Sequence, residues 1–259
     1  MPAEPTILRL LCFIVAVRIE NVASNAKIRI VGGTSVDINQ RPYMLSLHYS
    51  HGFACGASIL SARWGITALH CLTLDKTRNY HVRAGSNSPY RGGSRHGLTE
   101  VHAYNATAFL HWFNSMFYYD IALFKVWPPF RFSRRVKAAQ LPKESSRPPR
   151  RLSVCGWGYQ EFQQNAKVSN TLMGVTVRHV PYKVCVNQTK DYQMLVDKEH
   201  HLCYGTPGKD SCSGDSGGPL GSKHTIYGVV SFGQNCGVVS GIYENISYYR
   251  GWVKNITNI

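Results

Sequence analysis

A serine at position 216 lies between small residues in the segment Cys-Ser-Gly-Asp-Ser-Gly-Gly-Pro, residues 212–219. Small neighbours let the backbone turn tightly enough to aim the N–H groups of Gly214 and Ser216 at one point. A hydroxyl group beside such a pair of donors is suited to attack a carbonyl carbon and to stabilise the resulting oxyanion. The segment alone is also compatible with an ordinary loop. Candidate partner residues elsewhere in the chain therefore decide whether Ser216 is a nucleophile.

Those partners must include a base and an acid. A serine hydroxyl is a weak nucleophile until a base takes its proton, and the base needs an acid to fix its tautomer. His70 follows an apolar, strand-like run at 64–66, and Asp120 heads another apolar run at 121–126. Alone, His70 has an ordinary explanation as a core histidine, and Asp120 as the cap of a strand. Together with Ser216 they form a candidate set for acyl transfer.

The chain order His70, Asp120, Ser216 resembles that of the chymotrypsin-like serine proteases, and the whole is closest in character to the trypsins of arthropods. The resemblance covers nearly everything from Ile30 to the C-terminus. It implies peptide-bond hydrolysis through an acyl-enzyme, without a cofactor, in which the N–H groups of Gly214 and Ser216 bind the oxyanion. Further matching motifs are Ile-Val-Gly-Gly at 30–33, Arg-Pro-Tyr at 41–43, Cys-Gly at 55–56, Gly-Trp-Gly at 156–158, Ser-Phe-Gly at 231–233 and Gly-Ile-Tyr at 241–243.

The same resemblance implies cleavage after Arg or Lys, because Asp210 takes the position that forms the floor of the primary pocket. A carboxylate in a narrow, partly desolvated slot favours a guanidinium or ammonium group over an apolar side chain. The alternative is a solvated loop aspartate after Lys209. The other residues implied in substrate binding are Ser211, Ser231, Phe232, Gly233 and Gly241. Phe232 stands where the family usually has tryptophan, which predicts a smaller aromatic wall.

Activation by cleavage is a further expectation. Arg29 precedes Ile30, and by resemblance the bond between them is cut by a trypsin-like enzyme. The freed amine of Ile30 then folds inward and pairs with Asp215, which holds Gly214 in the oxyanion-binding geometry. A buried ion pair is favourable only if both charges are well paired and hydrogen-bonded. The alternative to an activation site is that Arg29 is an ordinary basic residue before a strand.

Short apolar, β-branched and aromatic runs separated by Gly, Pro, Asn and Ser predict an all-β protein. Examples of such runs are 43–48, 64–68, 121–126, 172–177 and 226–232. The resemblance turns this into two antiparallel six-stranded β-barrels with the site between them, and a short C-terminal helix over 248–256. We expect a signal peptide and activation propeptide at 1–29, the first barrel at 30–130, and the second barrel with the helix at 131–259.

Eight cysteines and four Asn-X-Ser/Thr sequons favour an oxidising, secretory route. An apolar run of about eight residues near the N-terminus suits a signal peptide and is too short for the ~20 residues of a membrane helix. By resemblance, the disulfides are Cys55–Cys71, Cys185–Cys203 and Cys212–Cys236. Cys12 is expected to be removed with the signal peptide, which leaves Cys155 as a buried free thiol, with an intermolecular bridge as the alternative. The sequons are at Asn105, Asn187, Asn245 and Asn255.

The formal net charge is +15, and a cluster of bases lies at 131–151. Such a cluster could hold a sulfated polysaccharide, but a solvated basic surface that aids solubility is the favoured explanation. Nucleic acid is not expected, because no stacking aromatics alternate with the bases. The segment 85–99 lacks the acidic pair of calcium-binding trypsins, so no metal site is predicted. The expected partners are protein substrates and serine protease inhibitors, and the chain is expected to act as a monomer. The alternative function is a non-catalytic homologue that binds a partner.

Overall fold

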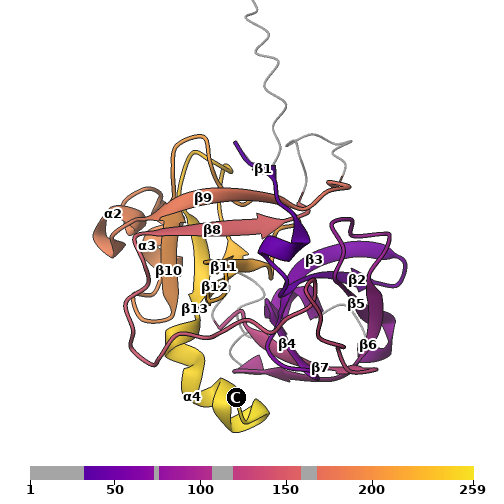
Figure 1. Ribbon diagram of the computed structural model, residues 1–259. Helices are drawn as coiled ribbons and strands as arrows, with labels where there is room; N and C mark the ends of the chain where they lie inside the picture. Colours follow the sequence, from indigo (N-terminus) through magenta and orange to yellow (C-terminus); the bar gives the residue numbers. More distant parts are fainter. Residues whose placement is uncertain (1–31, 73–75, 107–118, 159–167) are drawn as a thin grey trace, which may run out of the picture.

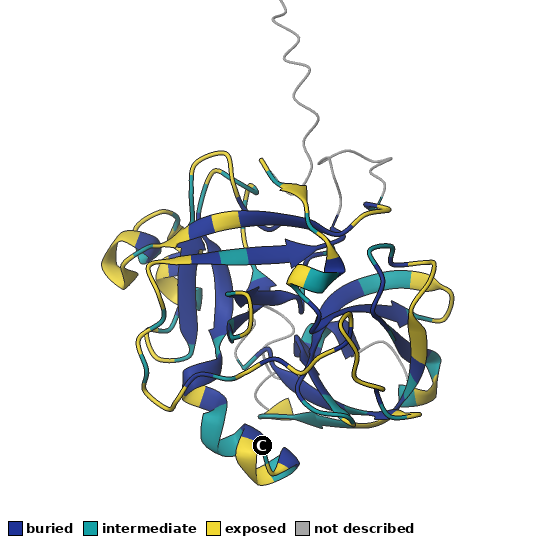
Figure 2. Cartoon of the chain, viewed as in Figure 1, coloured by how far each residue is buried: buried dark blue, intermediate teal, exposed yellow. Residues whose placement is uncertain are grey.

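The computed structural model describes residues 32–72, 76–106, 119–158 and 168–259. Two β-barrels lie side by side, and the chain ends in a helix (Figure 1). Buried residues follow the strands of both barrels, while exposed residues gather in the connecting loops (Figure 2). Strands β2 and β3 of the first barrel approach β8 and β11 of the second, so the barrels are in direct contact.

The first barrel is closed by six antiparallel strands in the order β2-β3-β4-β7-β6-β5. Its interior is packed with apolar side chains such as Leu45, Ile66 and Phe124, all fully buried. Closure removes the free edges that an open sheet would expose. The strands are β2 (Met44–Tyr49), β3 (Gly52–Ile59), β4 (Trp64–Thr67), β5 (Tyr80–Ala84), β6 (Ser94–Ala103) and β7 (Ala122–Trp127).

The second barrel also has six antiparallel strands, and it closes because β8 pairs with both β9 and β11. A short N-terminal strand, β1 (Thr34–Ser35), is added to β9, so the beginning of the described chain belongs to the second barrel. This architecture confirms the predicted fold class. The strands are β8 (Arg151–Gly156), β9 (Met173–His179), β10 (His201–Gly205), β11 (Pro219–Gly221), β12 (Ile226–Phe232) and β13 (Gly241–Asn245).

The C-terminal helix, α4 (Ile246–Thr257), begins two residues before the predicted start and ends one residue after the predicted end. Asn245 explains the earlier start, because its side chain accepts a hydrogen bond from the N–H of Ser247 at 3.2 Å. Asn258 ends the helix in a left-handed conformation with φ of 59°. Val253 is fully buried, and Trp252 packs partly buried against the core.

Short helices connect the strands outside the barrels. Three are 3₁₀ turns, and the other two flank a loop of the second barrel before β10. They are η1 (Ile38–Gln40), η2 (Leu69–Leu72), η3 (Thr77–Asn79), α2 (Tyr182–Val186) and α3 (Lys190–Leu195). Among the described residues, no helix has the length and apolar character that a membrane span requires.

The segment between the barrels crosses the surface of the first barrel before it reaches the second. The N–H of Ala139 donates to Ile59 in the first barrel, and the next residue, Gln140, donates to His224 in the second. The basic side chains of this segment are all exposed, with Glu144 as the only acid among them. They are Arg131, Arg134, Arg135, Lys137, Lys143, Arg147, Arg150 and Arg151.

Three disulfides join the expected pairs: Cys55–Cys71, Cys185–Cys203 and Cys212–Cys236. Cys155 is a buried free thiol, and burial raises its pKa to about 11. The protonated thiol is therefore the form present at neutral pH, and it behaves as a small apolar side chain.

Packing across the β4–β7 pair gives a prediction for stability. The ring of Phe124 covers its cross-strand partner Gly65, and a Cβ at Gly65 would lie 2.2 Å from Phe124 Cζ. Gly65→Ala should therefore lower stability by about 1–3 kcal/mol through overpacking. Gly97→Ala is the matched control, because a Cβ there meets nothing closer than 3.7 Å. Denaturant titration of both variants checks this, and equal effects would contradict it.

Candidate active site

His70 and Asp120 are 50 residues apart, yet strand pairing brings them to one edge of the first barrel. His70 lies on η2, which follows β4, and Asp120 lies just before β7. The last residue of β4, Thr67, pairs with the first residue of β7, Ala122. In an antiparallel pair, the chain leaving one strand and the chain entering the other emerge together. Strand pairing within the first barrel therefore brings the two residues to the same edge.

Asp120 is fully buried and accepts hydrogen bonds from both barrels. Its Oδ1 accepts the backbone N–H of His70 at 2.8 Å, and its Oδ2 lies 2.7 Å from His70 Nδ1. Oδ2 also accepts the hydroxyl of Ser231, on β12, at 2.6 Å. Because an ionised carboxylate only accepts, Nδ1 carries the hydrogen. The other ring nitrogen, Nε2, then carries no hydrogen, which is the form that a general base needs.

The charge of Asp120 also sets the basicity of His70. Burial alone would lower the pKa of His70, but the charge of Asp120 and its hydrogen bond outweigh burial, so the pKa lies above its usual value. The imidazolium form is stabilised in this way, as expected of a base that must accept a proton.

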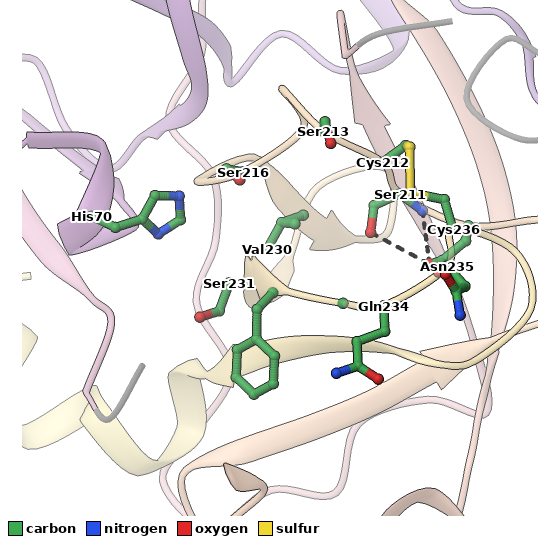
Figure 3. A pocket seen from close by; sticks show the side chains of 13 residues that line it. His70, Ser211, Cys212, Ser213, Ser216, Val230, Ser231, Gln234, Asn235 and Cys236 are labelled. Carbon is green, nitrogen blue, oxygen red and sulfur yellow. Dashed lines mark hydrogen bonds between the residues drawn. A yellow bond between two sulfur atoms is a disulfide. The ribbon is translucent and has the colours of Figure 1, made fainter. Parts of the chain in front are cut away.

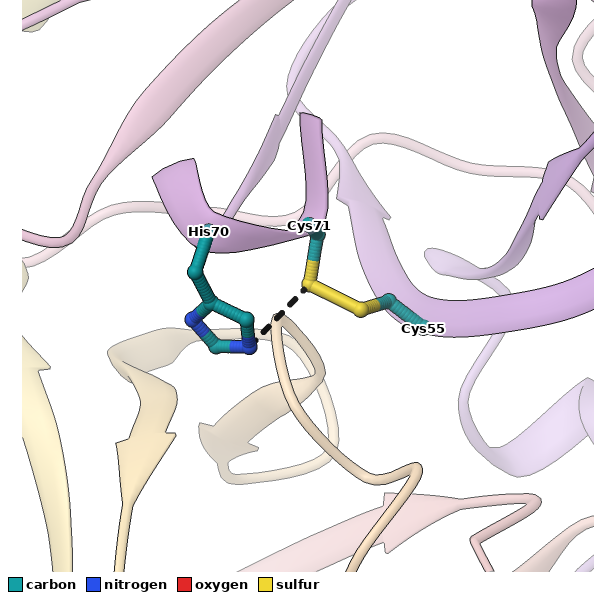
Figure 4. Close-up of side chains that lie close together, drawn as sticks. All are labelled: Cys55, His70 and Cys71. Carbon is teal, nitrogen blue, oxygen red and sulfur yellow. Dashed lines mark hydrogen bonds between the residues drawn. A yellow bond between two sulfur atoms is a disulfide. The ribbon is translucent and has the colours of Figure 1, made fainter. Parts of the chain in front are cut away.

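Cys55, His70 and Cys71 bring one potential ligand atom each within 4.8 Å of one another. Figure 4 shows His70 Nε2 beside the sulfur of Cys71, at 3.6 Å. Both sulfurs belong to the Cys55–Cys71 disulfide, however, and zinc binds cysteine as the thiolate. The cluster therefore offers only one metal ligand, the imidazole, and it does not fit a metal site.

Ser216 lies in a tight turn that is anchored to both barrels. Its carbonyl accepts the N–H of Gly56 on β3 at 2.8 Å, and the N–H of the next residue, Gly217, donates to Val230 on β12. Gly214 has a φ of 89°, a conformation that favours glycine. Within the described part of the chain, the N–H groups of Gly214 and Ser216 donate to no other protein group, so both remain available to a ligand.

Asp215 lies fully buried behind this turn. Its two oxygens accept the N–H groups of Gly158 at 2.9 Å and Cys212 at 3.0 Å. Burial raises the pKa of Asp215 to about 6, against the effect of these two bonds. A Cβ at Gly158 would lie 2.6 Å from the carboxyl carbon, and one at Gly156 would lie 2.2 Å from Oδ1. The Gly-Trp-Gly motif therefore leaves space for the acid. Arg29 and Ile30 lie outside the described residues.

A cavity of about 460 Å³ contains most of the expected substrate-binding residues. His70 and Ser216 lie at one end and the Cys212–Cys236 disulfide lies at the other (Figure 3). The lining includes Asp210, Ser211, Ser231, Phe232 and Gly233. Sequence reasoning missed four further lining residues, which are Ser213, Val230, Gln234 and Asn235.

Asp210 is 2 % exposed in this cavity. Its Oδ1 accepts the N–H of Ser211 at 2.8 Å, and its Oδ2 accepts the N–H of Gly237 at 3.4 Å. Burial outweighs these bonds and raises the pKa of Asp210 to about 7. Gly241 lies against the same carboxylate, where a Cβ would come within 2.8 Å of Oδ1. The position therefore has no room for a side chain.

A second cavity of about 410 Å³ adjoins the first and shares His70 and Ser216 with it. Its lining is mostly apolar and aromatic, in contrast to the carboxylate-containing first cavity. The residues that line it besides the shared pair are Tyr49, Gly52, Phe53, Ala54, Cys55 and Cys71. An extended chain that crosses both cavities would pass between His70 and Ser216.

Comparison with known proteins agrees with this arrangement. The family model described as Trypsin matches residues 30–253. The chain is 34 % identical over 232 residues to Trypsin delta of Drosophila erecta, with 87 % of each chain covered. It is 32 % identical over 235 residues to Trypsin alpha of Drosophila melanogaster, covering 89 % of this chain and 88 % of the relative.

The chain belongs to the trypsin family. It is therefore a trypsin-like serine endopeptidase, a hydrolase that acts on proteins. Its departures from the usual trypsin pattern do not touch His70, Asp120 or Ser216. They concern instead the aromatic wall of the cavity, at Phe232.

Proposed function

We propose that this endopeptidase is secreted as a zymogen and cleaves peptide bonds after Arg or Lys through the triad His70, Asp120 and Ser216. One observation carries the proposal. The cavity that holds the buried acid Asp210 is the same cavity that His70 and Ser216 line. A substrate whose side chain reaches Asp210 would place its backbone carbonyl beside Ser216.

In the proposed reaction, Ser216 Oγ attacks the carbonyl while His70 Nε2 takes its proton. Asp120 keeps the hydrogen on Nδ1 and stabilises the imidazolium that forms. The N–H groups of Gly214 and Ser216 bind the oxyanion, and each such donor is worth about 10²–10³ in rate. His70 then gives the proton to the leaving amine. A water molecule activated in the same way releases the acid product from Ser216.

The specificity follows from the cost of an uncompensated buried charge. The carboxylate of Asp210 is almost completely buried, so its ionised form is unfavourable without a cationic partner. A substrate Arg or Lys supplies that cation. Tyr243 supports the floor from behind, with its hydroxyl 3.3 Å from Ser211 Oγ.

Asp210→Asn tests this specificity. The variant should lose about 10²- to 10³-fold in kcat/KM for an Arg ester, because the substrate cation is left unpaired. Asp191→Asn is the matched control, because Asp191 is exposed and contacts the pocket only through Gln234. The two variants are compared on Arg and Leu esters after activation. An unchanged preference for Arg in Asp210→Asn would refute the assignment.

The raised pKa of Asp210 gives a pH dependence. An amidinium inhibitor needs the carboxylate form, which is lost as the pH falls through about 7 in the free enzyme. Binding of benzamidine should therefore weaken below that pH and strengthen above it. The Asp210→Asn variant should lack this component, and any remaining dependence would belong to His70. Calorimetric Kd values from pH 5 to 9 measure the effect, and identical curves for both proteins would count against it.

Activation is tested with the full chain. The uncleaved protein should hydrolyse an Arg ester at a small fraction of the rate of the cleaved protein, because Asp215 lacks the Ile30 amine as a partner. Arg29→Gln should remain uncleaved at this bond and inactive after treatment with a trypsin-like enzyme. Ser216→Ala should be cleaved yet inactive, which also controls for the added enzyme. Full activity of the Arg29→Gln chain would exclude the mechanism.

Secretion, a monomeric state and recognition by serine protease inhibitors complete the proposal. The three disulfides support an oxidising compartment. A sulfated polysaccharide as partner of the exposed bases at 131–151 stays a prediction. Membership of the trypsin family favours the enzyme over a non-catalytic homologue.

A further inference from the structure

A second buried carboxylate lies directly behind Asp120. Glu244 belongs to β13 of the second barrel and is fully buried. Its Oε1 accepts the backbone N–H of Asp120 at 2.9 Å, across the junction of the two barrels. Asp120 is thus held twice: its side chain contacts His70 and Ser231, and its backbone is bonded to Glu244.

Two further side chains surround the carboxylate of Glu244. The hydroxyl of Tyr249, on α4, donates to Oε2 at 2.5 Å. His201, on β10, has its Nε2 3.4 Å from Oε1. His201 Nδ1 accepts the N–H of Asp197 at 3.0 Å, so the ring hydrogen lies on Nε2 and faces Glu244. Burial and then the charge of Glu244 raise the pKa of Tyr249 far above its usual value, so its phenol keeps the proton that it donates.

The donor set fits a carboxylate anion. The N–H of Asp120 and the hydroxyl of Tyr249 donate to Glu244, and His201 Nε2 lies within ion-pair distance of it. A buried carboxylate is tolerated only where such groups meet it. A backbone N–H could be satisfied by a much smaller neutral acceptor. A full negative charge at this place therefore requires an explanation beyond the packing of the barrel junction.

We propose that Glu244 is a positioning residue for the triad, which fixes the backbone of Asp120 from the second barrel and adds a second negative charge behind the Asp120–His70 pair. The inference rests on the proposed function of that pair. A charge placed there favours the imidazolium that forms when Ser216 attacks. Because the charge acts through Asp120, Glu244 touches neither the substrate nor the reacting atoms.

The other titratable groups around Glu244 belong to four elements. They are Asp120 and Tyr119 before β7, Asp197, Glu199 and His200 in the turn before β10, His201 on β10, and Tyr248 and Tyr249 on α4. His200 Nδ1 lies 3.5 Å from Asp197 Oδ1, but burial lowers the pKa of His200, so its neutral imidazole does not cancel the charge of Asp197.

Glu244→Gln separates charge from shape, because its amide oxygen can still accept the N–H of Asp120. The variant should fold with three disulfides, and its kcat for an Arg ester should fall roughly tenfold with KM nearly unchanged. The acid limb of its pH profile should move to lower pH, because the imidazolium loses a stabilising charge. The kcat of Glu244→Ala should fall further than that of Glu244→Gln. The conservative variant would thus rescue part of the activity.

Tyr249→Phe should shift the acid limb of the pH profile in the opposite direction. This variant removes one donor and leaves the charge of Glu244 less well compensated, so the acid limb should move to higher pH. Glu100→Gln is the control for losing one acid, because Glu100 is exposed and paired with Lys125; its profile should match the wild type. Acid limbs that stay in place in both Glu244→Gln and Tyr249→Phe would overturn the proposal and leave Glu244 a purely structural residue.

The same experiment keeps the two proposals apart. Asp120→Asn and Ser216→Ala are measured beside the Glu244 variants. If both lose activity while Glu244→Gln keeps the wild-type kcat and pH profile, only the role of Glu244 fails. If Asp120→Asn or Ser216→Ala keeps the wild-type rate, the triad itself fails.

Discussion

The burial of the Asp120 carboxylate constrains the rest of the structure. A fully buried negative charge is unfavourable unless several donors meet it, and here the donors come from both barrels. His70 contributes two from the first barrel and Ser231 contributes one from the second. The barrels therefore cannot separate without stripping this acid of a partner. Docking of the barrels and assembly of the site are one physical event.

The turn that carries Ser216 depends on the same junction. Its carbonyl is bonded to Gly56 of the first barrel, while Asp215 fills the space left by Gly156 and Gly158 of the second. The backbone of this turn is thus fixed at both ends before a ligand arrives. In the proposed function, its two unused N–H groups bind the developing oxyanion once the Ile30 amine has paired with Asp215.

Local patterns in the sequence predicted an all-β protein, and the family resemblance predicted the two barrels and most of the residues that line the cavity. Each predicted apolar run begins and ends within two residues of an observed strand, and the cysteines pair as expected. The cluster of Glu244, His201 and Tyr249 was not predicted, because its members come together from three separate elements, β13, β10 and α4. No local pattern indicates that a glutamate in a strand faces inward. Asn245 was interpreted only as a sequon, whereas its side chain caps α4 and donates to Glu199.

Asp210 and Asp215 show why specificity and activation share one physical basis. Burial raises both pKa values, to about 7 and about 6, so the fold disfavours their ionised forms. Above these pH values each charge lowers the stability of the free protein, and the penalty is relieved as the pH falls. Among the described residues neither acid has a cationic partner. In the proposed function each receives one later, Asp210 from the substrate and Asp215 from the new N-terminus. Unfavourable burial in the unligated chain is thereby converted into selective binding of a cation.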